Sequence, residues 1–352
     1  MFELLSEPQW MAAVGLLGGV LLGLAARLGR FCTLGAIEDM LYGGSDVRMR
    51  MWLLAIGVAI TGSFALMGSE WLIGTDTFYL SIQWMPMASV VGGLMFGYGM
   101  ALSGNCGFGA IARLGGGDLR SFVIVLVMGI STYVVLAGPL APLRDWMFHQ
   151  TPVVGSTPPG IAHALAGLSG LSVTGIGITI GLCLCAGALM SQTFRAAPSS
   201  MIWAAIVGLA IISGWAGTAW VAANGFEANQ VVSHSYSAPL GETILYAMTG
   251  GTRTISFAVG SVAGVWIGAF IGSLIKGHFR WEACDDPREL RRQIIGAAIM
   301  GAGAVIAMGC TVGQGLSAFS VLAFGAPVTM IAIVAGAALG LRQLITGFSL
   351  AE

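Results

Sequence analysis

Apolar runs of roughly twenty residues, separated by shorter polar segments, extend along almost the whole chain. About 20 consecutive apolar residues are enough for a helix to cross a bilayer, so runs of this length predict transmembrane helices. We expect nine spans, near 9–29, 51–69, 84–103, 120–140, 171–190, 199–219, 255–276, 293–309 and 326–346. The pattern predicts an all-α polytopic membrane protein, with residues 1–352 forming a single integral-membrane transport domain.

Four shorter segments of low charge lie between these runs, near 32–43, 105–116, 235–250 and 310–323. They are too short to cross a membrane and too apolar for ordinary loops. Irregular backbone is tolerated at membrane depth only where protein buries it or where it lines a cavity. We therefore expect four short re-entrant half-helices.

Composition supports the membrane assignment. Only 9% of the 352 residues are charged and 56% are hydrophobic, whereas a soluble domain has about 25% charged residues. The N-terminus carries Glu3 and Glu7 before its apolar run and has no basic segment, so we predict a membrane helix there and not a cleaved signal peptide. The net charge of −1 indicates no partner.

The basic residues predict the orientation. With the N-terminus outside and the C-terminus in the cytoplasm, 13 of the 15 Lys and Arg residues fall inside and only Arg144 and Arg253 fall outside. Such a bias is typical of cytoplasmic segments. The polar loop 276–292 would then be cytoplasmic, and its mixed charge is typical of a solvated loop.

Three of the six cysteines share the pattern Cys-x-x-Gly, and each follows an apolar run. They are Cys32, Cys106 and Cys310. A helix that begins just after each cysteine would direct its free N–H groups and its positive dipole end at the space beside the thiol. A thiol adds a weak S–H donor and a polarisable surface. This combination suits a small, soft anion that carries a terminal sulfur, because hard oxyanions are better bound by Arg or hydroxyl donors.

An internal repeat is indicated by a shift of 204 residues. The shift places Gly97 on Gly301, Cys106 on Cys310, Glu38 on Glu242 and Cys32 on Tyr236. Repeat 1 would cover about 9–140 and repeat 2 about 199–346, with an extra helix near 171–190. Five crossings separate the two repeats, so they would be inverted, as in many transporters. An imported anion would then meet Cys310 before Cys106, and Cys32 last; the order reverses if the preceding spans carry Cys106 and Cys310 to opposite surfaces.

The neighbours of the thiols complete the candidate site. Small or polar residues keep the backbone approachable, Arg30 lies two residues before Cys32, and Glu38 could carry a proton or form a cap or ion pair. The candidate substrate-binding residues are Tyr236, Asn105, Gly107, Gly109, Thr311, Gly313, Gln314, Arg30 and Glu38.

Other interpretations remain open. Buried cysteines often act as small hydrophobic residues, which is the interpretation we favour for Cys183 and Cys185, whereas Cys284 is an incidental thiol of the polar loop. Three thiolates could bind a soft metal ion, but the four histidines are scattered. A sulfurtransferase or thiol redox protein would need a thiolate near a cation, which only Cys32 has in Arg30. No phosphate loop, catalytic triad or nucleic-acid patch is found, and no cofactor is expected.

The motifs resemble those of the YeeE/YedE family of sulfur-transport membrane proteins, which includes thiosulfate uptake proteins. The resemblance covers nearly the whole chain and is carried by Gly29-Arg30-Phe31-Cys32, by Ser103-Gly104-Asn105-Cys106-Gly107-Phe108-Gly109 and by Gly309-Cys310-Thr311-Val312-Gly313-Gln314-Gly315. The chain has Thr311 where many members of the family have proline.

The resemblance implies an hourglass-shaped bacterial inner-membrane protein of nine spans plus half-helices, and transport without enzymatic chemistry. Thiosulfate, or a related sulfur or selenium anion, would pass along Cys32, Cys106 and Cys310 by S–H···S hydrogen bonds. The family also implies a small TusA-like sulfurtransferase as a separate cytoplasmic partner.

Overall fold

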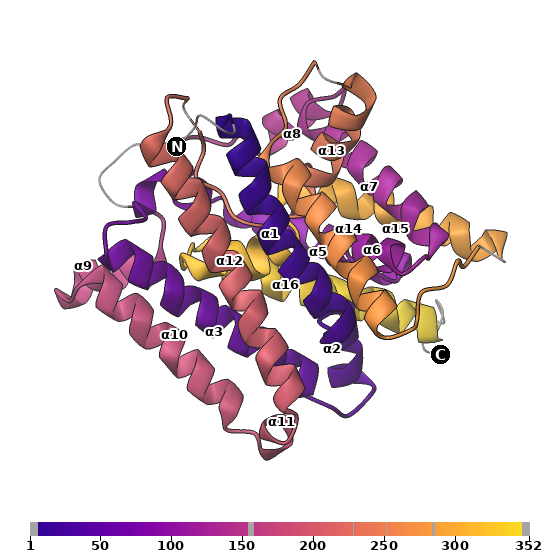
Figure 1. Ribbon diagram of the computed structural model, residues 1–352, viewed down its shortest axis with the longest axis horizontal. Helices are drawn as coiled ribbons and strands as arrows, with labels where there is room; N and C mark the ends of the chain where they lie inside the picture. The colour runs from indigo at the N-terminus through magenta and orange to yellow at the C-terminus, as the bar shows by residue number, and fades with distance from the viewer. Residues whose placement is uncertain (1–5, 154–157, 228, 251, 284–285, 347–352) are drawn as a thin grey trace.

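The computed structural model describes residues 6–153, 158–227, 229–250, 252–283 and 286–346. These residues form helices and a few isolated β-bridges but no strand. A long helix lies at each predicted span (Figure 1): α1 (Glu7–Leu28), α3 (Val47–Gly68), α5 (Pro86–Ser103), α7 (Leu119–Leu136), α10 (Val173–Leu189), α12 (Pro198–Asn224), α14 (Phe257–Ile275), α15 (Pro287–Ile306) and α16 (Gly325–Thr346).

Seven helical segments of the described residues are long and apolar enough to cross a membrane. An eighth is obtained if α10 and the short α9 (Ile161–Ser169), which are bent by 119° relative to each other, count as one span. The first turns of α15 carry Arg288, Glu289, Arg291 and Arg292, which lower its hydropathy. The protein is an all-α polytopic membrane protein, and the number of nine spans stays a prediction.

Each of the four segments predicted as half-helices contains a short helix. These are α2 (Thr33–Leu41), α6 (Gly107–Gly115), α13 (Ala238–Thr249) and the π-helical η2 (Gly313–Ala318). α2 and α6 follow α1 and α5 after breaks of a few residues, so that 7–41 and 86–115 each count as one apolar stretch. The remaining short helices are η1 (Gly74–Asp76), α4 (Phe78–Ser81), α8 (Ala141–Met147) and α11 (Gln192–Arg195).

Glycine stripes let the long helices pack closely. On α1, a Cβ atom at Gly15, Gly19 or Gly23 would collide with the backbone of α14. On the facing stripe of α14, a Cβ atom at Gly260, Gly264 or Gly268 would collide with the backbone of α1. Small residues four apart let membrane helices pack closely, because association inside lipid depends on van der Waals contact and not on hydrophobic burial. Figure 1 shows α1 and α14 side by side as a result.

A second close contact joins α5 and α15. Gly92 lies against Gly303, and Gly99 lies against Gly296. The shift of 204 residues places Gly92 on Gly296 and Gly99 on Gly303. It therefore exchanges the two contacts, as a two-fold repeat requires. The same shift relates the packing of α1 on α14 to that of α12 on α3, and the packing of α5 on α16 to that of α15 on α7. The inverted repeat itself stays a prediction.

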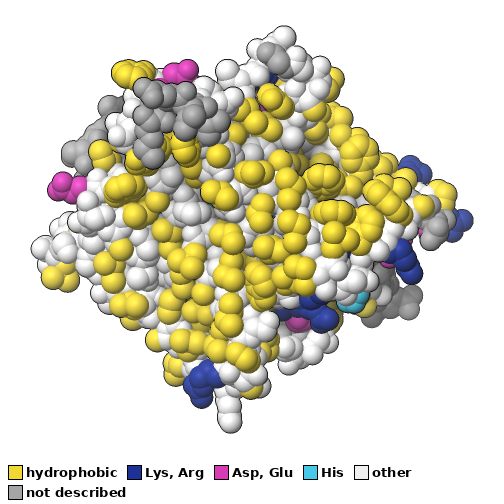
Figure 2. All heavy atoms as spheres, viewed as in Figure 1, with side chains coloured by type: hydrophobic (Ala, Val, Ile, Leu, Met, Phe, Trp, Pro, Cys, Tyr) yellow, Lys and Arg dark blue, Asp and Glu magenta, His cyan; other side chains and the backbone are white. Residues whose placement is uncertain are grey.

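The surface suits a lipid environment. In Figure 2 hydrophobic side chains cover the broad middle of the visible face, over α1, α12 and α14, while charged side chains gather at its margins. Large apolar side chains of these three helices, such as Leu17, Leu209 and Ile271, are exposed. Of the described residues that are buried, Asp118 alone is an Asp, Glu, Lys or Arg. Charge is therefore concentrated toward the two ends of the helices.

Candidate functional site

The three Cys-x-x-Gly motifs have one local geometry. In each, the cysteine precedes a short helix and its sulfur accepts a hydrogen bond from the backbone N–H of the glycine three residues later. The N–Sγ distances are 3.5 Å for Gly35 to Cys32, 3.4 Å for Gly109 to Cys106 and 3.4 Å for Gly313 to Cys310. This is the geometry of a helix N-cap, in which a side chain satisfies one of the free N–H groups of the first turn. The spacing of the motif thus follows from capping, with a thiol in place of the usual hydroxyl or carboxylate.

The backbone before each cysteine is also the same. The residue two positions earlier has a positive φ angle: 56° at Arg30, 75° at Gly104 and 57° at Met308. This conformation lets the long helix end and the chain turn into the next helix. It suits glycine but strains other residues. At Arg30 and Met308 the positive φ strains the backbone. Two of the three breaks therefore have a strained residue two positions before the thiol.

Tyr236, which the repeat relates to Cys32, does not cap a helix. Ser237 is the residue before α13 and makes no side-chain cap. The position three after the tyrosine is Pro239, which has no N–H to donate. Instead, the N–H of Tyr236 donates to Sγ of Cys310 at 3.2 Å. The sulfur of Cys310 is therefore held by two backbone donors, and the predicted equivalence of four positions is wrong with respect to capping.

Two cavities open at opposite ends of α1 and α14, each of about 350 Å³. The first, the Cys32 vestibule, is lined by Cys32 and by the C-terminal ends of both helices, including Arg27 and Ser273. The second, the Tyr79 vestibule, is lined by Tyr79 and by residues near their N-terminal ends, including Met11 and Phe257. This arrangement is hourglass-like.

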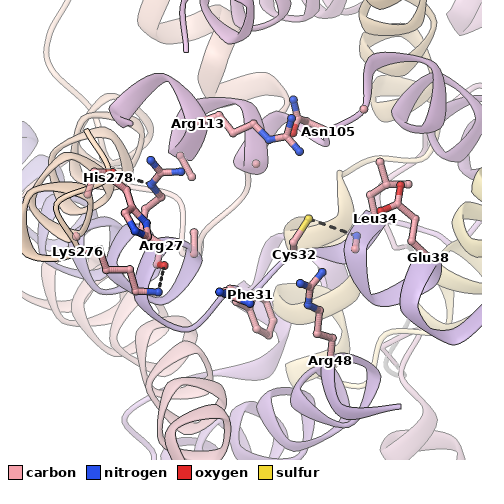
Figure 3. A pocket seen from close by; sticks show the side chains of 18 residues that line it. Arg27, Phe31, Cys32, Leu34, Glu38, Arg48, Asn105, Arg113, Lys276 and His278 are labelled. Carbon is pink, nitrogen blue, oxygen red and sulfur yellow. Dashed lines mark hydrogen bonds between the residues drawn. The ribbon is translucent and has the colours of Figure 1, made fainter. Parts of the chain in front are cut away.

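The wall of the Cys32 vestibule is strongly basic (Figure 3). It carries Arg27, Arg30, Arg48, Arg113, Lys276 and His278, whereas Glu38 is its one acidic side chain. Burial and the nearby guanidinium groups of Arg30 and Arg27 lower the pKa of Lys276. Burial is the larger cause of this shift and the neighbouring positive charges add to it, because both disfavour the protonated ammonium group. A bound anion would relieve the crowding of positive charge.

The Tyr79 vestibule has little free charge. Arg144 bonds to the carboxylate of Asp145 and donates to the carbonyl oxygen of Leu136 at 3.2 Å. Glu242 accepts a hydrogen bond from the hydroxyl of Ser256. Much of the remaining polar wall is formed by serine hydroxyls, including those of Ser233, Ser235 and Ser237.

Cys106 and Cys310 lie buried in the packed interior. Each is only 1% exposed. Cys106 lies within electrostatic range of both Cys32 and Cys310. Ser235, on the wall of the Tyr79 vestibule, approaches Sγ of Cys310 at 3.8 Å. The three thiols thus lie along the way from one vestibule to the other.

Several predicted site residues surround these thiols. The buried hydroxyl of Thr311 lies beside the thiol of Cys106, whereas Oε1 of Gln314 has no hydrogen-bond partner in the described part of the chain. Nε2 of Gln314 donates to the carbonyl oxygen of Ala307 at 2.8 Å and so fixes the break before Cys310. An unused buried amide oxygen is consistent with a polar ligand or a water molecule at this point.

The other predicted positions are divided between wall and packing. The residues on the wall of the Cys32 vestibule are Arg30, Glu38, Asn105 and Gly109. Gly107 packs against Met128 and the backbone of Tyr236, where a Cβ atom would be 2.9 Å from the carbonyl oxygen. Gly313 lies close to Ser235 and Tyr79, so a side chain there would reach the wall of the other vestibule.

Some residues of the site were missed by the sequence analysis. Arg27, Arg48, Arg113 and Lys276 were counted there only as cytoplasmic charges, yet they surround one cavity. Their signal in the sequence is a basic residue next to the end of an apolar run, which also marks ordinary membrane boundaries. Tyr79, in the short α4, had no signal.

The cysteines outside the motif lie elsewhere. Cys183 and Cys185 are on α10, and Sγ of Cys185 faces Gly57 of α3. Cys284 lies outside the described residues. No group of three or more His, Cys, Asp or Glu side chains in the described ranges is placed to hold a metal ion.

Comparisons with known proteins agree with this geometry. The sequence model of the Sulphur transport family matches residues 28–339. A protein of Escherichia coli (strain K12) named thiosulfate transporter TsuA is 26% identical over 318 residues, which cover 87% of each chain. A protein of the same name from Spirochaeta thermophila is 24% identical over 341 residues, covering 93% of this chain and 97% of the relative.

Proposed function

Because this chain belongs to the Sulphur transport family, we propose that it takes up thiosulfate, or a closely related sulfur anion, through the membrane of a bacterial cell. The two relatives named thiosulfate transporter support this choice of substrate. The observation that carries the proposal is the row of three thiols, each capping a helix, between two vestibules. A relay of sulfur contacts suits an anion whose terminal atom is sulfur.

The capping geometry suggests how a thiol serves as a donor. Because each Sγ accepts an N–H from its own helix, a lone pair of the sulfur is already engaged and the S–H proton is available to a ligand. The N-termini of the nine-residue helices α2 and α6 add their positive dipole ends. The anion would pass between thiols by S–H···S hydrogen bonds. No covalent bond to cysteine forms in this mechanism.

The residues of the relay are assigned in order. In the proposed orientation, with the N-terminus outside and the C-terminus in the cytoplasm, the anion enters the Tyr79 vestibule. It contacts Cys310 first, Cys106 next and Cys32 last, and leaves through the Cys32 vestibule. Tyr236, Asn105, Thr311 and Gln314 and the glycines of the motifs shape this path. Arg30 and Glu38 act at its cytoplasmic end.

Two broader features belong to the proposal. The membrane is the bacterial inner membrane, and residues 1–352 form one transport domain with two inverted repeats and an extra helix near 171–190. A TusA-like sulfurtransferase receives the imported sulfur at the cytoplasmic face.

One observation favours a second candidate. Cys32 lies in a vestibule with several guanidinium groups, which is the environment that stabilises a thiolate. In a membrane sulfurtransferase, a Cys32 thiolate would attack the outer sulfur of thiosulfate, the S–S bond of thiosulfate would break, and sulfite would leave as the persulfide forms. Mass spectrometry after incubation with thiosulfate separates the two, because the transporter proposal expects no persulfide on Cys32.

The central experiment measures uptake of labelled thiosulfate into membrane vesicles. The variant with Cys32, Cys106 and Cys310 all changed to serine is compared with a control in which Cys183 and Cys185 are changed to serine. We expect uptake by the unmodified protein and the control, and background uptake by the triple variant. Equal uptake by all three proteins would contradict the proposal.

The orientation is tested separately with a membrane-impermeant thiol reagent. Cys32 should react only when the reagent reaches the cytoplasmic face, since it is the half-buried thiol on a vestibule wall. Fast modification of Cys32 from outside would reverse the assigned order.

A further inference from the structure

The Cys32 vestibule has more positive charge than the transport of one anion through it requires. Five Lys and Arg side chains face a single carboxylate around one cavity of about 350 Å³: Arg27, Arg30, Arg48, Arg113 and Lys276. Positive charges that share a low-dielectric cavity raise the local concentration of anions. The simplest consequence is a site at which an anion stays bound and does not only pass through.

Two of these cations are held by no close contact among the described residues, although one of them, Arg113, lies within electrostatic range of the Glu38 carboxylate. The side chains of Arg30 and Arg113 make no hydrogen bond and no ion pair with another residue of the described ranges. The other three are engaged with the protein, through Arg27 to Ser273 at 2.6 Å, Arg48 to Asp39 at 3.1 Å and Lys276 to the carbonyl oxygens of Arg27 and Leu28 at 2.9 and 3.0 Å. The cavity therefore has three fixed cations and two guanidinium groups with unused donors.

The Tyr79 vestibule offers no comparable set. Arg144 is the one Arg or Lys on its described wall, and it is already bonded to Asp145 and Leu136. Glu242 faces the same cavity and repels anions. Among the described residues, a cluster of cations thus lines the cavity on one side of the buried thiols and not the cavity on the other side.

We propose that the Cys32 vestibule binds small divalent oxyanions such as sulfate. Sulfate bound there, on the side where thiosulfate leaves, inhibits thiosulfate transport. Guanidinium groups bind hard oxygen atoms through charge-assisted hydrogen bonds. Sulfate has oxygen at all four corners, so it binds the arginines but presents no terminal sulfur to Cys32. It occupies the exit without entering the relay.

The inference rests on the proposed function and adds regulation to it. Thiosulfate leaving Cys32 has to pass the same guanidinium groups, so sulfate and thiosulfate exclude each other from the vestibule. When sulfate accumulates in the cytoplasm, uptake of thiosulfate slows. The contacts are partly exposed to solvent, so added salt weakens them.

The test uses right-side-out membrane vesicles loaded with sulfate or with an equal ionic strength of chloride. Sulfate inside should reduce the initial rate of labelled thiosulfate uptake, whereas the same sulfate outside should have little effect. In the double variant R30Q/R113Q we expect the inhibition by internal sulfate to require about tenfold more sulfate. The control R280Q removes a cytoplasmic cation outside the cavity, whose side chain is 81% exposed, and should keep normal inhibition. Each protein is compared with itself, so altered basal rates do not affect the result.

A binding measurement keeps the test independent of transport. Equilibrium binding of labelled sulfate to the purified, detergent-solubilised protein should weaken about tenfold in R30Q/R113Q and not in R280Q. Thiosulfate uptake that is insensitive to internal sulfate, or sulfate binding that is equal in all proteins, would overturn the inference. Absence of thiosulfate uptake by the unmodified protein would contradict the proposed function instead, and the binding assay would still decide whether the vestibule holds sulfate.

Discussion

Cys106 and Cys310 have nearly the same surroundings, although 204 residues of chain separate them. Each is 1% exposed, and each accepts the N–H of a glycine at 3.4 Å. A residue with positive φ, Gly104 or Met308, lies two positions before each thiol. The pair related by the same shift at the outer positions, Cys32 and Tyr236, shares neither exposure nor capping: Cys32 caps α2 on a vestibule wall, whereas Tyr236 is fully buried and caps no helix.

The difference shows which part of a duplicated architecture can change. Each of the two central thiols accepts the N–H of the glycine three residues later, and Cys310 also accepts the N–H of Tyr236. At the outer positions one copy keeps a thiol beside a basic cavity, while the other has an aromatic ring packed on Phe108 with centroids 5.3 Å apart. The two vestibules also differ: the Cys32 vestibule is strongly basic, whereas the Tyr79 vestibule has little free charge.

The largest expected effect comes from the central pair. C106A and C310A should each reduce thiosulfate uptake about tenfold or more, because each loses the S–H donor and the helix cap. Size-exclusion chromatography in detergent should show folded protein, since loss of one cap costs only about 1 kcal/mol. C183A and C185A are matched controls and should retain uptake. Equal losses at all four positions would show that the Cys-x-x-Gly motif has no special role.

Serine at the same positions separates capping from transport. In C106S and C310S the hydroxyl can accept the glycine N–H, so thermal stability should be close to that of the unmodified protein. Uptake should still fall about tenfold, because a hydroxyl lacks the polarisable surface of a thiol. Recovery of uptake in the serine variants would mean that the cap alone matters.

A smaller effect is expected at Tyr236. Y236F keeps the ring and the backbone N–H that donates to Cys310, but loses the hydroxyl, which accepts from Ser261 at 3.1 Å and lies 3.5 Å from Nδ1 of His234. Uptake should fall by about twofold to fivefold, corresponding to one lost hydrogen bond. A loss as large as that of C310A would place the hydroxyl itself in the relay.

The smallest effects concern the backbone before the central thiols. G104A should lower the free energy of unfolding by about 1 kcal/mol, because alanine is strained at a φ of 75°. M308G should raise it by less than about 1 kcal/mol, since relief of strain is partly offset by the greater entropy of an unfolded glycine. Thermal unfolding in detergent measures both. A change of the same sign in the two variants would contradict the equivalence of the two breaks.

The helices and the positions of the thiols could be predicted from the sequence because both depend on local properties. An apolar run of sufficient length forms a helix in a membrane whatever its neighbours are. The expectation that a helix begins just after each motif cysteine is confirmed for Cys32 and Cys106, where α2 and α6 start at the next residue. The capping bond follows from the spacing of three residues, and it was not recognised in the sequence.

The vestibules could not be predicted, because they depend on how distant segments meet. Arg30 follows α1, Arg113 lies in the last turn of α6 and Lys276 follows α14; the packing of α14 against α1 and α6 brings them to one cavity. The failure of Tyr236 to act as a fourth cap did have a signal in the sequence. Pro239 replaces the glycine of the motif, and proline has no N–H.

The described buried interior has almost no charged side chains, and this affects which ions can enter it. With Asp118 as the single buried Asp, Glu, Lys or Arg of the described residues, the region between the vestibules holds thiols and backbone N–H groups but no carboxylate for a metal cation. A sodium or potassium ion would have to shed its water there without compensation, at a cost of many kcal/mol. We therefore expect this region to admit an anion more readily than a sodium or potassium ion.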